Sequence, residues 1–314
     1  MEASIYHSPL PFEFGKRPKT GRGSAIAHHG EILQGVFERP DGLCRGLVSL
    51  ICNLFKSEAT FYPDSSGVVN VDPVWRIKAR TAAQLTLSAL DAEKIGGHLQ
   101  ISSNVPTAWG LGSSTSDVTA SIRAVAGAVG VRLARENIAK LAVEAEQASD
   151  PLMFGNRAVL FGHRSGFIIE DFGGPLPHIE VVGFNTDMTT NGINTANFTP
   201  ARYSWREIEE FRSLMGLMRQ AIRTQNVSLI GRVASVSASI NQRHLPTPRF
   251  GRLEKLIEEV GASGVQVAHS GTVVGLLFDP QDTGKEQRVE CAQALVAEMG
   301  FGPIWRFRTG SEIR

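Results

Sequence analysis

Apolar and polar residues recur along the chain with two different periods, which predict a protein of mixed α and β structure. Runs rich in β-branched and aromatic residues predict strands, whereas apolar residues spaced three or four apart predict helices. Strands are predicted at 31–37, 47–62, 97–105, 179–184 and 303–307, with a hairpin at 265–278. Helices are predicted at 76–95, 115–129, 136–147, 205–223, 227–241, 253–261 and 286–299. From residue 179 onward, apart from extra helices, this order is a split βαβ, ferredoxin-like plan.

The pattern also predicts a division into domains. Residues 1–23 contain Pro and Gly interruptions and no helical or strand periodicity, so we expect a flexible N-terminal arm. A chain of 314 residues with 42% hydrophobic content is long enough for two domains that share a cleft. We expect an N-terminal domain over 24–183 and a C-terminal domain over 184–314.

Composition and charge exclude several classes of function. The formal net charge is only +1, which argues against a nucleic-acid partner. No apolar run approaches the roughly 20 residues that span a bilayer, and the N-terminus lacks the apolar core of a signal peptide. We therefore expect a cytoplasmic protein without a membrane partner, and a homodimer is one arrangement that the sequence leaves open. The cysteines at 44, 52 and 291 fit no metal-ligand spacing.

The segment 104–117 combines a strand end, a glycine-rich turn and a helix start. Gly110 and Gly112 permit backbone angles that other residues avoid, and they carry no Cβ to hold a polyphosphate away. The helix that begins near Ser113 offers free N–H groups and the positive end of its dipole. We therefore predict a phosphate-binding turn. Its contacts are expected from Pro106, Trp109, Gly110, Leu111, Gly112, Ser113, Ser114 and Thr115.

This turn matches neither of two familiar nucleotide-binding motifs. No Lys follows the glycines, as a Walker loop requires, and the glycine spacing is not that of the dinucleotide fingerprint. An ordinary serine-capped helix after a tight glycine turn is an alternative that this fragment alone leaves open.

The order of the residues is more informative than the turn alone. Pro106 followed by Gly-Leu-Gly-Ser-Ser at 110–114 resembles the signature of the GHMP kinases, the superfamily of galactokinase, homoserine kinase, mevalonate kinase and phosphomevalonate kinase. AHHGEILQG at 27–35 resembles the first motif of the L-threonine kinase branch, with His28 and His29 where Ser and Cys are typical. GVQVAHSGTVVGLLF at 264–278 is similar to that branch's third motif, a hairpin whose tip reaches the active site. Segments 182–187 and 240–246 also have the character of this branch.

The resemblance implies a fold and a reaction. The implied fold is an α+β, two-domain GHMP kinase fold, with a mixed α/β N-terminal domain that carries the phosphate-binding turn and a ferredoxin-like C-terminal domain. The implied reaction is ATP-dependent, magnesium-assisted transfer of the γ-phosphoryl group to the hydroxyl of L-threonine or a related small hydroxy amino acid. Since His28 and His29 replace Ser and Cys, a serine, homoserine or non-proteinogenic analogue is also compatible. A homoserine or sugar kinase and a non-catalytic ATP-dependent sensor remain alternatives.

The resemblance also implies a magnesium site. In the superfamily, a Glu at a helix end and the second Ser of the Gly-Leu-Gly-Ser-Ser string hold the metal, which points to Glu146 and Ser114. Glu144 is the alternative, because residues two apart project about 200° apart on a helix and only one can face a metal.

Asp150, in SDPLMF at 149–154, resembles the place where many of these kinases carry a catalytic Asp. In that role it orients the acceptor hydroxyl and accepts its proton. An ordinary turn residue before Pro151 is the alternative. The spacing from Glu146 to Asp150 is shorter than in mevalonate kinase or galactokinase, and some members of the superfamily work without a base.

Two further segments are predicted to form the substrate pocket. Adjacent residues on a strand point to opposite faces, so at most one of His28 and His29 lines the cleft. Glu31, with Gln34 beside it, is expected to receive an α-ammonium group or to orient the acceptor, and a solvent-facing strand carboxylate is the alternative. His163 and Arg164 are interpreted as a surface loop, with contact to a phosphate or carboxylate group as the alternative. The predicted substrate contacts are His29, Glu31, Gln34, His269, Ser270, Gly271 and Thr272.

Overall fold

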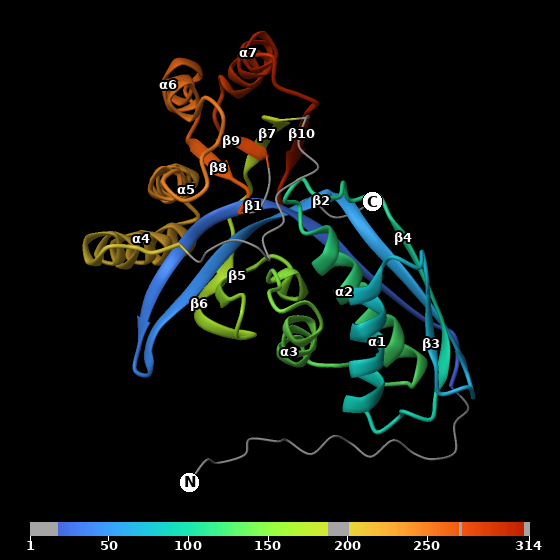
Figure 1. The fold of residues 1–314 in the computed structure, drawn as a ribbon. Helices are drawn as coiled ribbons and strands as arrows, with labels where there is room; N and C mark the ends of the chain where they lie inside the picture. Colours follow the sequence, from blue (N-terminus) through green and yellow to red (C-terminus); the bar gives the residue numbers. More distant parts are fainter. Residues whose placement is uncertain (1–17, 188–200, 270–271, 311–314) are drawn as a thin grey trace.

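The computed structural model describes residues 18–187, 201–269 and 272–310 (Figure 1). A long antiparallel pair, β1 (Gly21–Arg39) and β2 (Gly42–Asp64), runs across the whole molecule. β4 (Gly96–Ser103) pairs with β2, and β3 (Val69–Asp72) lies parallel to β4 at the edge of the sheet. α2 (Ser113–Ala128) packs on β1 and β2, with α1 (Ile77–Ala89) and α3 (Arg135–Glu146) beside it. These elements place the predicted phosphate-binding turn on the sheet.

β1 begins at Gly21, within the segment 1–23 that was predicted to be a flexible arm. Residues 1–17 of that arm lie outside the described residues, but Gly21 to Gly23 already pair with β2. A Cβ at Gly21 or Gly23 would lie 2.0 or 2.1 Å from a carbonyl oxygen of α2, so these glycines allow the helix to approach the strand. From the local sequence these glycines look like interruptions, because the helix that they pack against is about a hundred residues away.

The C-terminal half has the predicted ferredoxin-like order. β7 (Glu180–Asn185) is followed by α4 (Trp205–Thr224), α5 (Val227–Asn241), α6 (Phe250–Val260), β8 (Gly264–Val267), β9 (Val273–Phe278), α7 (Lys285–Glu298) and β10 (Ile304–Arg308). The strand order is β10-β7-β9-β8, all antiparallel, which confirms the split βαβ plan. α4 begins with a capping box between Ser204 and Glu207. The domain boundary proposed near Gly183 lies within β7.

β8 also pairs with β1, so one sheet continues through both halves of the chain. β5 (Arg157–Gly162) and β6 (Phe167–Pro175) form a hairpin, and β5 pairs with β2. Strands β3, β5 and β6 are additional to those predicted from the sequence. Because the sheet is shared, residues of the first motif in β1 lie between the phosphate-binding turn and the C-terminal helices.

A bulge in β1 decides which of its side chains face the site. The pairing of β1 with β2 shifts register between His28 and Glu31, and Gly30 has a φ of +101°. A Cβ at Gly30 would lie 2.3 Å from Gln266 Oε1, so glycine is required there for space as well as for conformation. The bulge breaks the simple alternation and lets His28 and Glu31, three residues apart, lie together.

A buried ion pair holds the segment before α1 against α2. Asp117 is buried on α2, where it pairs with Arg76 and accepts a hydrogen bond from Ser57 Oγ at 2.5 Å. We expect Asp117→Ala to lower the free energy of unfolding by about 3 kcal/mol, because the partly buried Arg76 loses its counter-charge. Urea denaturation measures this. Asp171→Ala, which breaks the exposed pair with Arg157, is the control and should change stability by less than about 1 kcal/mol; equal effects would contradict the assignment.

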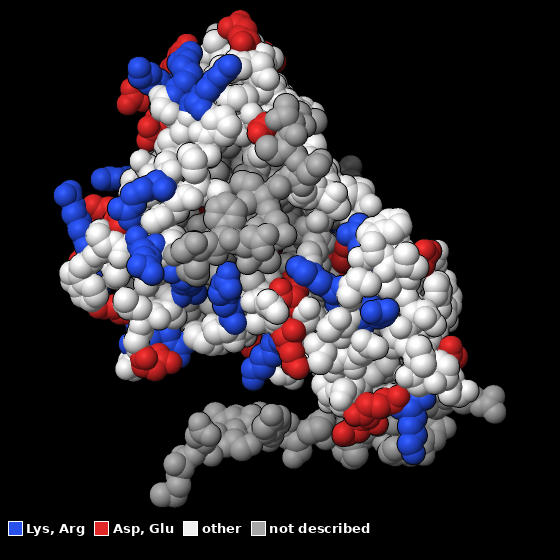
Figure 2. All heavy atoms as spheres, viewed as in Figure 1, with Lys and Arg blue, Asp and Glu red and all other residues white. Residues whose placement is uncertain are grey.

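Two further features of the described residues bear on partners. None of their helices has the length and apolar character needed to cross a membrane. On the face shown in Figure 2, Lys and Arg side chains are interspersed with Asp and Glu.

Candidate active site

The glycine-rich turn has the backbone geometry that the sequence predicts. Gly110 and Gly112 have φ values of +81° and +74°, and Gly112 is the N-cap of α2 without any side-chain cap. The serine-capped alternative is therefore wrong. Because no side chain caps the helix, its first N–H groups are free to bind an anion. The carbonyl oxygen of Leu111 accepts a hydrogen bond from the backbone N–H of His28 at 3.2 Å, which ties the turn to β1.

Glu146 lies against the start of α2. It is 7% exposed, and its two oxygens accept hydrogen bonds from Ser114 Oγ at 2.7 Å and Thr115 Oγ1 at 2.8 Å. Burial raises the pKa of Glu146 to about 7, although the two hydroxyls act in the opposite direction. Glu144 is exposed. Of the two glutamates that the sequence left open, Glu146 is the one brought to Ser114.

Asp150 follows α3 and faces the same turn. Its Oδ2 lies 3.2 Å from Thr115 Oγ1 and 3.2 Å from His28 Nε2. Burial raises the pKa of this carboxyl, but the charge and hydrogen bond of His28 outweigh burial and lower the pKa to about 2. Asp150 is therefore a carboxylate over the whole physiological pH range, with 22% of its side chain exposed.

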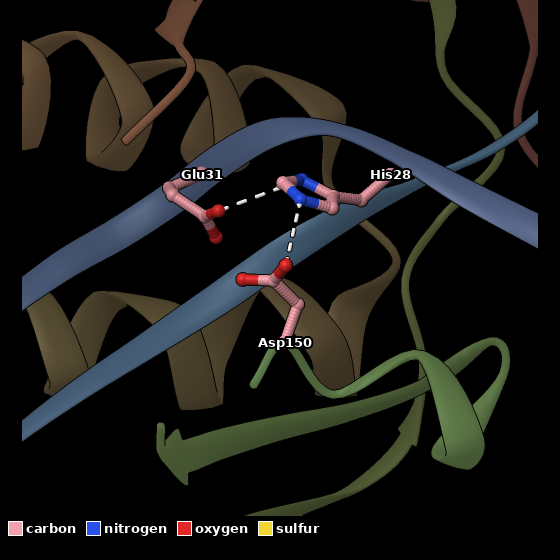
Figure 3. Close-up of side chains that lie close together, drawn as sticks. All are labelled: His28, Glu31 and Asp150. Atoms are coloured by element: carbon pink, nitrogen blue, oxygen red, sulfur yellow. Dashed lines mark ion pairs between the residues drawn. The ribbon is translucent and has the colours of Figure 1, made fainter. Parts of the chain in front are cut away.

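The imidazole of His28 lies between two carboxylates (Figure 3). Its Nε2 faces Asp150, and its Nδ1 lies 3.5 Å from Glu31 Oε1 and 3.0 Å from the backbone N–H of Gly30. Burial lowers the pKa of His28, but the two carboxylates outweigh burial and raise it to about 9. Glu31 also accepts a hydrogen bond from Ser49 Oγ at 2.7 Å, and burial raises its pKa to about 7.

His28 takes the place at the site that the sequence interpretation gave to His29. His29 is fully buried on the opposite face of β1, where Trp305 Nε1 donates to its Nε2 at 3.0 Å. Because Trp305 can only donate, Nε2 of His29 accepts, and the side-chain nitrogen of Gln266 lies 2.5 Å from His29 Nδ1. Burial, together with His28, lowers the pKa of His29 to about 3. His29 thus joins β1 to the C-terminal strands and does not reach the substrate pocket.

A pocket of about 260 Å³ opens in front of the turn. Its wall contains residues 110–115 of the turn, together with Glu146 and Asp150. Across from them, Gln34 and Asn241 form a polar wall. Asn241 Oδ1 accepts from Tyr203 Oη at 2.6 Å, and Asn241 Nδ2 donates to the carbonyl oxygen of Gln34 at 3.0 Å. Nucleotide-binding, metal-binding and substrate-binding candidates therefore share one cavity.

The other predicted residues lie as follows. Pro106 and Trp109 lie outside the pocket wall, and Trp109 stacks on Trp305 with ring centroids 5.9 Å apart. Glu31 lines a small adjoining cavity with Gln34 and His269. His269 lines both cavities. The carbonyl oxygen of Thr272 accepts hydrogen bonds from Thr186, while Ser270 and Gly271 lie outside the described residues.

Several pocket residues were missed or misread from the sequence. Arg45 of β2 and Lys78 of α1 line the pocket, and so do His163 and Arg164, which follow β5 and were interpreted as a surface loop. His163 is buried, and burial lowers its pKa to about 3. The sequence around His163 and Arg164 could have placed them. The apolar run at 158–162, a Ser-Gly turn and a second apolar run predict a hairpin.

The fold and this site define a class of protein. Residues 76–155 match the family model described as GHMP kinases N terminal domain, and residues 218–297 match the model described as GHMP kinases C terminal. Together the two matches cover just over half of the chain, and the first contains the turn, Glu146 and Asp150. The chain belongs to the GHMP kinase family.

Relatives of known function include L-threonine kinases and homoserine kinases. An L-threonine kinase from Salmonella typhimurium is 32% identical over 58% of this chain and 59% of its own length. A homoserine kinase from Lactococcus lactis subsp. lactis is 26% identical over 59% of this chain and 63% of its own length. The matches thus span about three fifths of these relatives. Among solved structures, a homoserine kinase from Cytophaga hutchinsonii has a TM-score of 0.67 at 15% identity, covering 95% of this chain and 96% of that one, which is a likeness of fold.

Proposed function

We propose that this protein is a kinase that transfers the γ-phosphoryl group of ATP to the side-chain hydroxyl of L-threonine or a related hydroxy amino acid. The observation that carries the proposal is the convergence of three features on one pocket. These are the uncapped start of α2, the Ser114–Glu146 contact and the partly exposed carboxylate of Asp150. The likeness to L-threonine kinases supports the choice of acceptor.

The turn and the carboxylate fit the charges of magnesium-ATP. Free N–H groups at the start of α2 suit the phosphates, and Lys78 adds a positive charge on the same wall. Ser114 and Glu146 offer oxygen ligands of the kind that Mg²⁺ prefers. Burial disfavours the ionised form of Glu146, and a bound cation would stabilise that form by supplying the opposite charge. Bound there, Mg²⁺ would neutralise charge on the transferred group.

The opposite wall fits the charged ends of an amino acid. Arg45 and Arg164 line the pocket, and Arg45 donates a hydrogen bond to the carbonyl oxygen of Ala201 at 2.5 Å. We assign them to the α-carboxylate of the acceptor. Gln34 offers its side-chain oxygen for the ammonium group. Glu31, which faces His28 and the small cavity, is less suited to that task than the sequence suggested.

The chemistry of the proposed step follows from these positions. The acceptor hydroxyl oxygen bonds to the γ-phosphorus while the bond from that phosphorus to the bridging oxygen breaks, so ADP leaves. The hydroxyl proton departs by way of Asp150 to solvent. Because His28 lowers the pKa of Asp150, we expect this carboxylate to act mainly by aligning and polarising the hydroxyl.

The proposal is tested by the product. Purified protein with magnesium-ATP is offered L-threonine, L-serine, L-homoserine and a set of sugars one at a time, and ADP release is followed together with the mass of the acceptor. We expect ADP and a phosphorylated acceptor in equal amounts with L-threonine or a close analogue. If ATP binds but no acceptor in the panel gains a phosphoryl group, the scaffold acts as a nucleotide sensor and the proposal fails.

Homoserine is the second candidate acceptor, because homoserine kinases are also among the relatives. It differs from threonine in placing a primary hydroxyl one bond farther from the α-carbon. Because the two amino acids are isomers that place the hydroxyl at different positions, the ratio of kcat/KM between them decides the assignment.

A further inference from the structure

His28 was not predicted to line the site, and contacts with Leu111, Gly30 and Gly112 hold its ring in place. It is 3% exposed, its backbone N–H is hydrogen-bonded to Leu111, and its Nδ1 lies 3.0 Å from the backbone nitrogen of Gly30. Its ring fills the space that the missing Cβ of Gly112 leaves, since a Cβ there would lie 2.4 Å from His28 Cδ2. The ring is therefore rigidly placed with Nε2 toward Asp150.

His28, Glu31 and Asp150 form a cluster of three potential ligands for a metal ion. Their candidate ligand atoms lie close enough together for one. The imidazole presents Nε2 to Asp150 and Nδ1 to Glu31 (Figure 3). Each ring nitrogen thus faces a carboxylate oxygen. The ring therefore bridges the two carboxylates.

The two oxygens of Asp150 have different surroundings. Oδ2 is held by His28 Nε2 and Thr115 Oγ1, each at 3.2 Å. Thr115 has one proton to donate and lies closer to Glu146, at 2.8 Å, so His28 is the firmer of the two donors to Asp150. Among the described residues Oδ1 has no hydrogen-bond partner, and the side chain is partly exposed to the pocket.

We propose that His28 is a positioning residue, which clamps one oxygen of Asp150 so that the other is aimed at the acceptor hydroxyl. This inference rests on the proposed kinase function. The imidazole of His28 is long enough to reach Asp150 from β1 and hold it. Fixing the carboxylate before the acceptor binds removes a rotation that would otherwise misalign the hydroxyl.

A double-mutant cycle tests whether His28 acts through Asp150. The variants are His28→Ala, His28→Gln, Asp150→Asn and the doubles with Asp150→Asn. We expect His28→Ala to lower kcat about thirtyfold, with KM for ATP changed less than about twofold, because alignment of the acceptor is lost and the nucleotide site is kept. His28→Gln, whose amide nitrogen can still donate near the position of Nε2, should recover to within about fivefold of wild type.

In the Asp150→Asn background, His28→Ala should lower kcat by no more than about twofold further, since the residue that it positions has already lost its charge. Full additivity of the two changes would overturn the inference. His98→Ala, at an exposed histidine on β4, is the matched control and should leave kcat unchanged.

Crystal structures of the two His28 variants give a readout that does not require activity. The carboxylate of Asp150 should turn away from its present position in His28→Ala and stay in place in His28→Gln. An unmoved Asp150 in His28→Ala would overturn the inference even in an active kinase. A wild-type protein that phosphorylates nothing would instead refute the proposed function, while the crystal structures would still decide whether His28 holds Asp150.

Discussion

Replacing Gly112 with Ala is expected to weaken the binding of magnesium-ATP about a hundredfold or more. Gly112 has a φ of +74°, a conformation that is strained for alanine, and it is the residue from which α2 begins. The new Cβ would lie 2.4 Å from His28 Cδ2 and 3.3 Å from Asp150 Oδ2. Since the buried ring of His28 has no room to retreat, the turn must move, and the N–H groups that face the phosphates move with it. Calorimetric titration with a non-hydrolysable ATP analogue measures the change in Kd.

The control for this experiment is another glycine-to-alanine change. Gly216 lies in α4, and a Cβ there meets nothing within 4 Å, so Gly216→Ala should leave the Kd unchanged and the fold intact. The Gly112 variant should still melt cooperatively, since the core around α2 is untouched. A Kd within about threefold of wild type would show that the triphosphate does not rest on this turn.

Replacing Asp150 with Asn is expected to lower kcat about a thousandfold. The amide has the size of the carboxylate but no charge, so it cannot polarise the hydroxyl or pass on its proton, functions that together are commonly worth 10² to 10⁴ in rate. KM for ATP should change little, because the turn and Glu146 are unaltered. Steady-state rates at saturating ATP and acceptor measure the effect, and unchanged turnover would remove Asp150 from the mechanism.

Two controls show whether a loss of activity in Asp150→Asn comes from the site or from a weakened fold. Asp150 interacts with His28, so melting temperatures of wild type and variant show whether the fold has been weakened. Asp171→Asn, at an exposed carboxylate on β6 that pairs with Arg157, is the matched control and should leave kcat unchanged. A loss of activity shared by both variants would point to a general defect rather than to the site.

Local signals in the sequence predicted most of the elements and part of the site. The glycines at 110 and 112 predicted a turn with positive φ, and α2 begins at Ser113 as expected. The two-residue spacing of Glu144 and Glu146 predicted that only one could face the site, and the structure brings Glu146 to Ser114. Such features can be predicted because they depend only on the backbone preferences of a few residues that are neighbours in the sequence.

The contacts that the sequence did not predict depend on partners far along the chain. His28 meets Asp150 only because the sheet and α3 bring β1 to residue 150, and no local pattern encodes that distance. The bulge at Gly30 shifts the alternation of β1, so Glu31 joins His28 on the same side. Arg45 entered no prediction because a single arginine in a long strand resembles any solvent-facing residue.

A crystal structure of the protein with a non-hydrolysable ATP analogue, Mg²⁺ and L-threonine tests the central claim most directly. We predict the triphosphate on the backbone N–H groups of residues 110–115, the metal between Ser114 and Glu146, and the threonine hydroxyl between Asp150 Oδ1 and the γ-phosphate. A nucleotide bound elsewhere, or an acceptor hydroxyl that faces away from Asp150, would contradict the account.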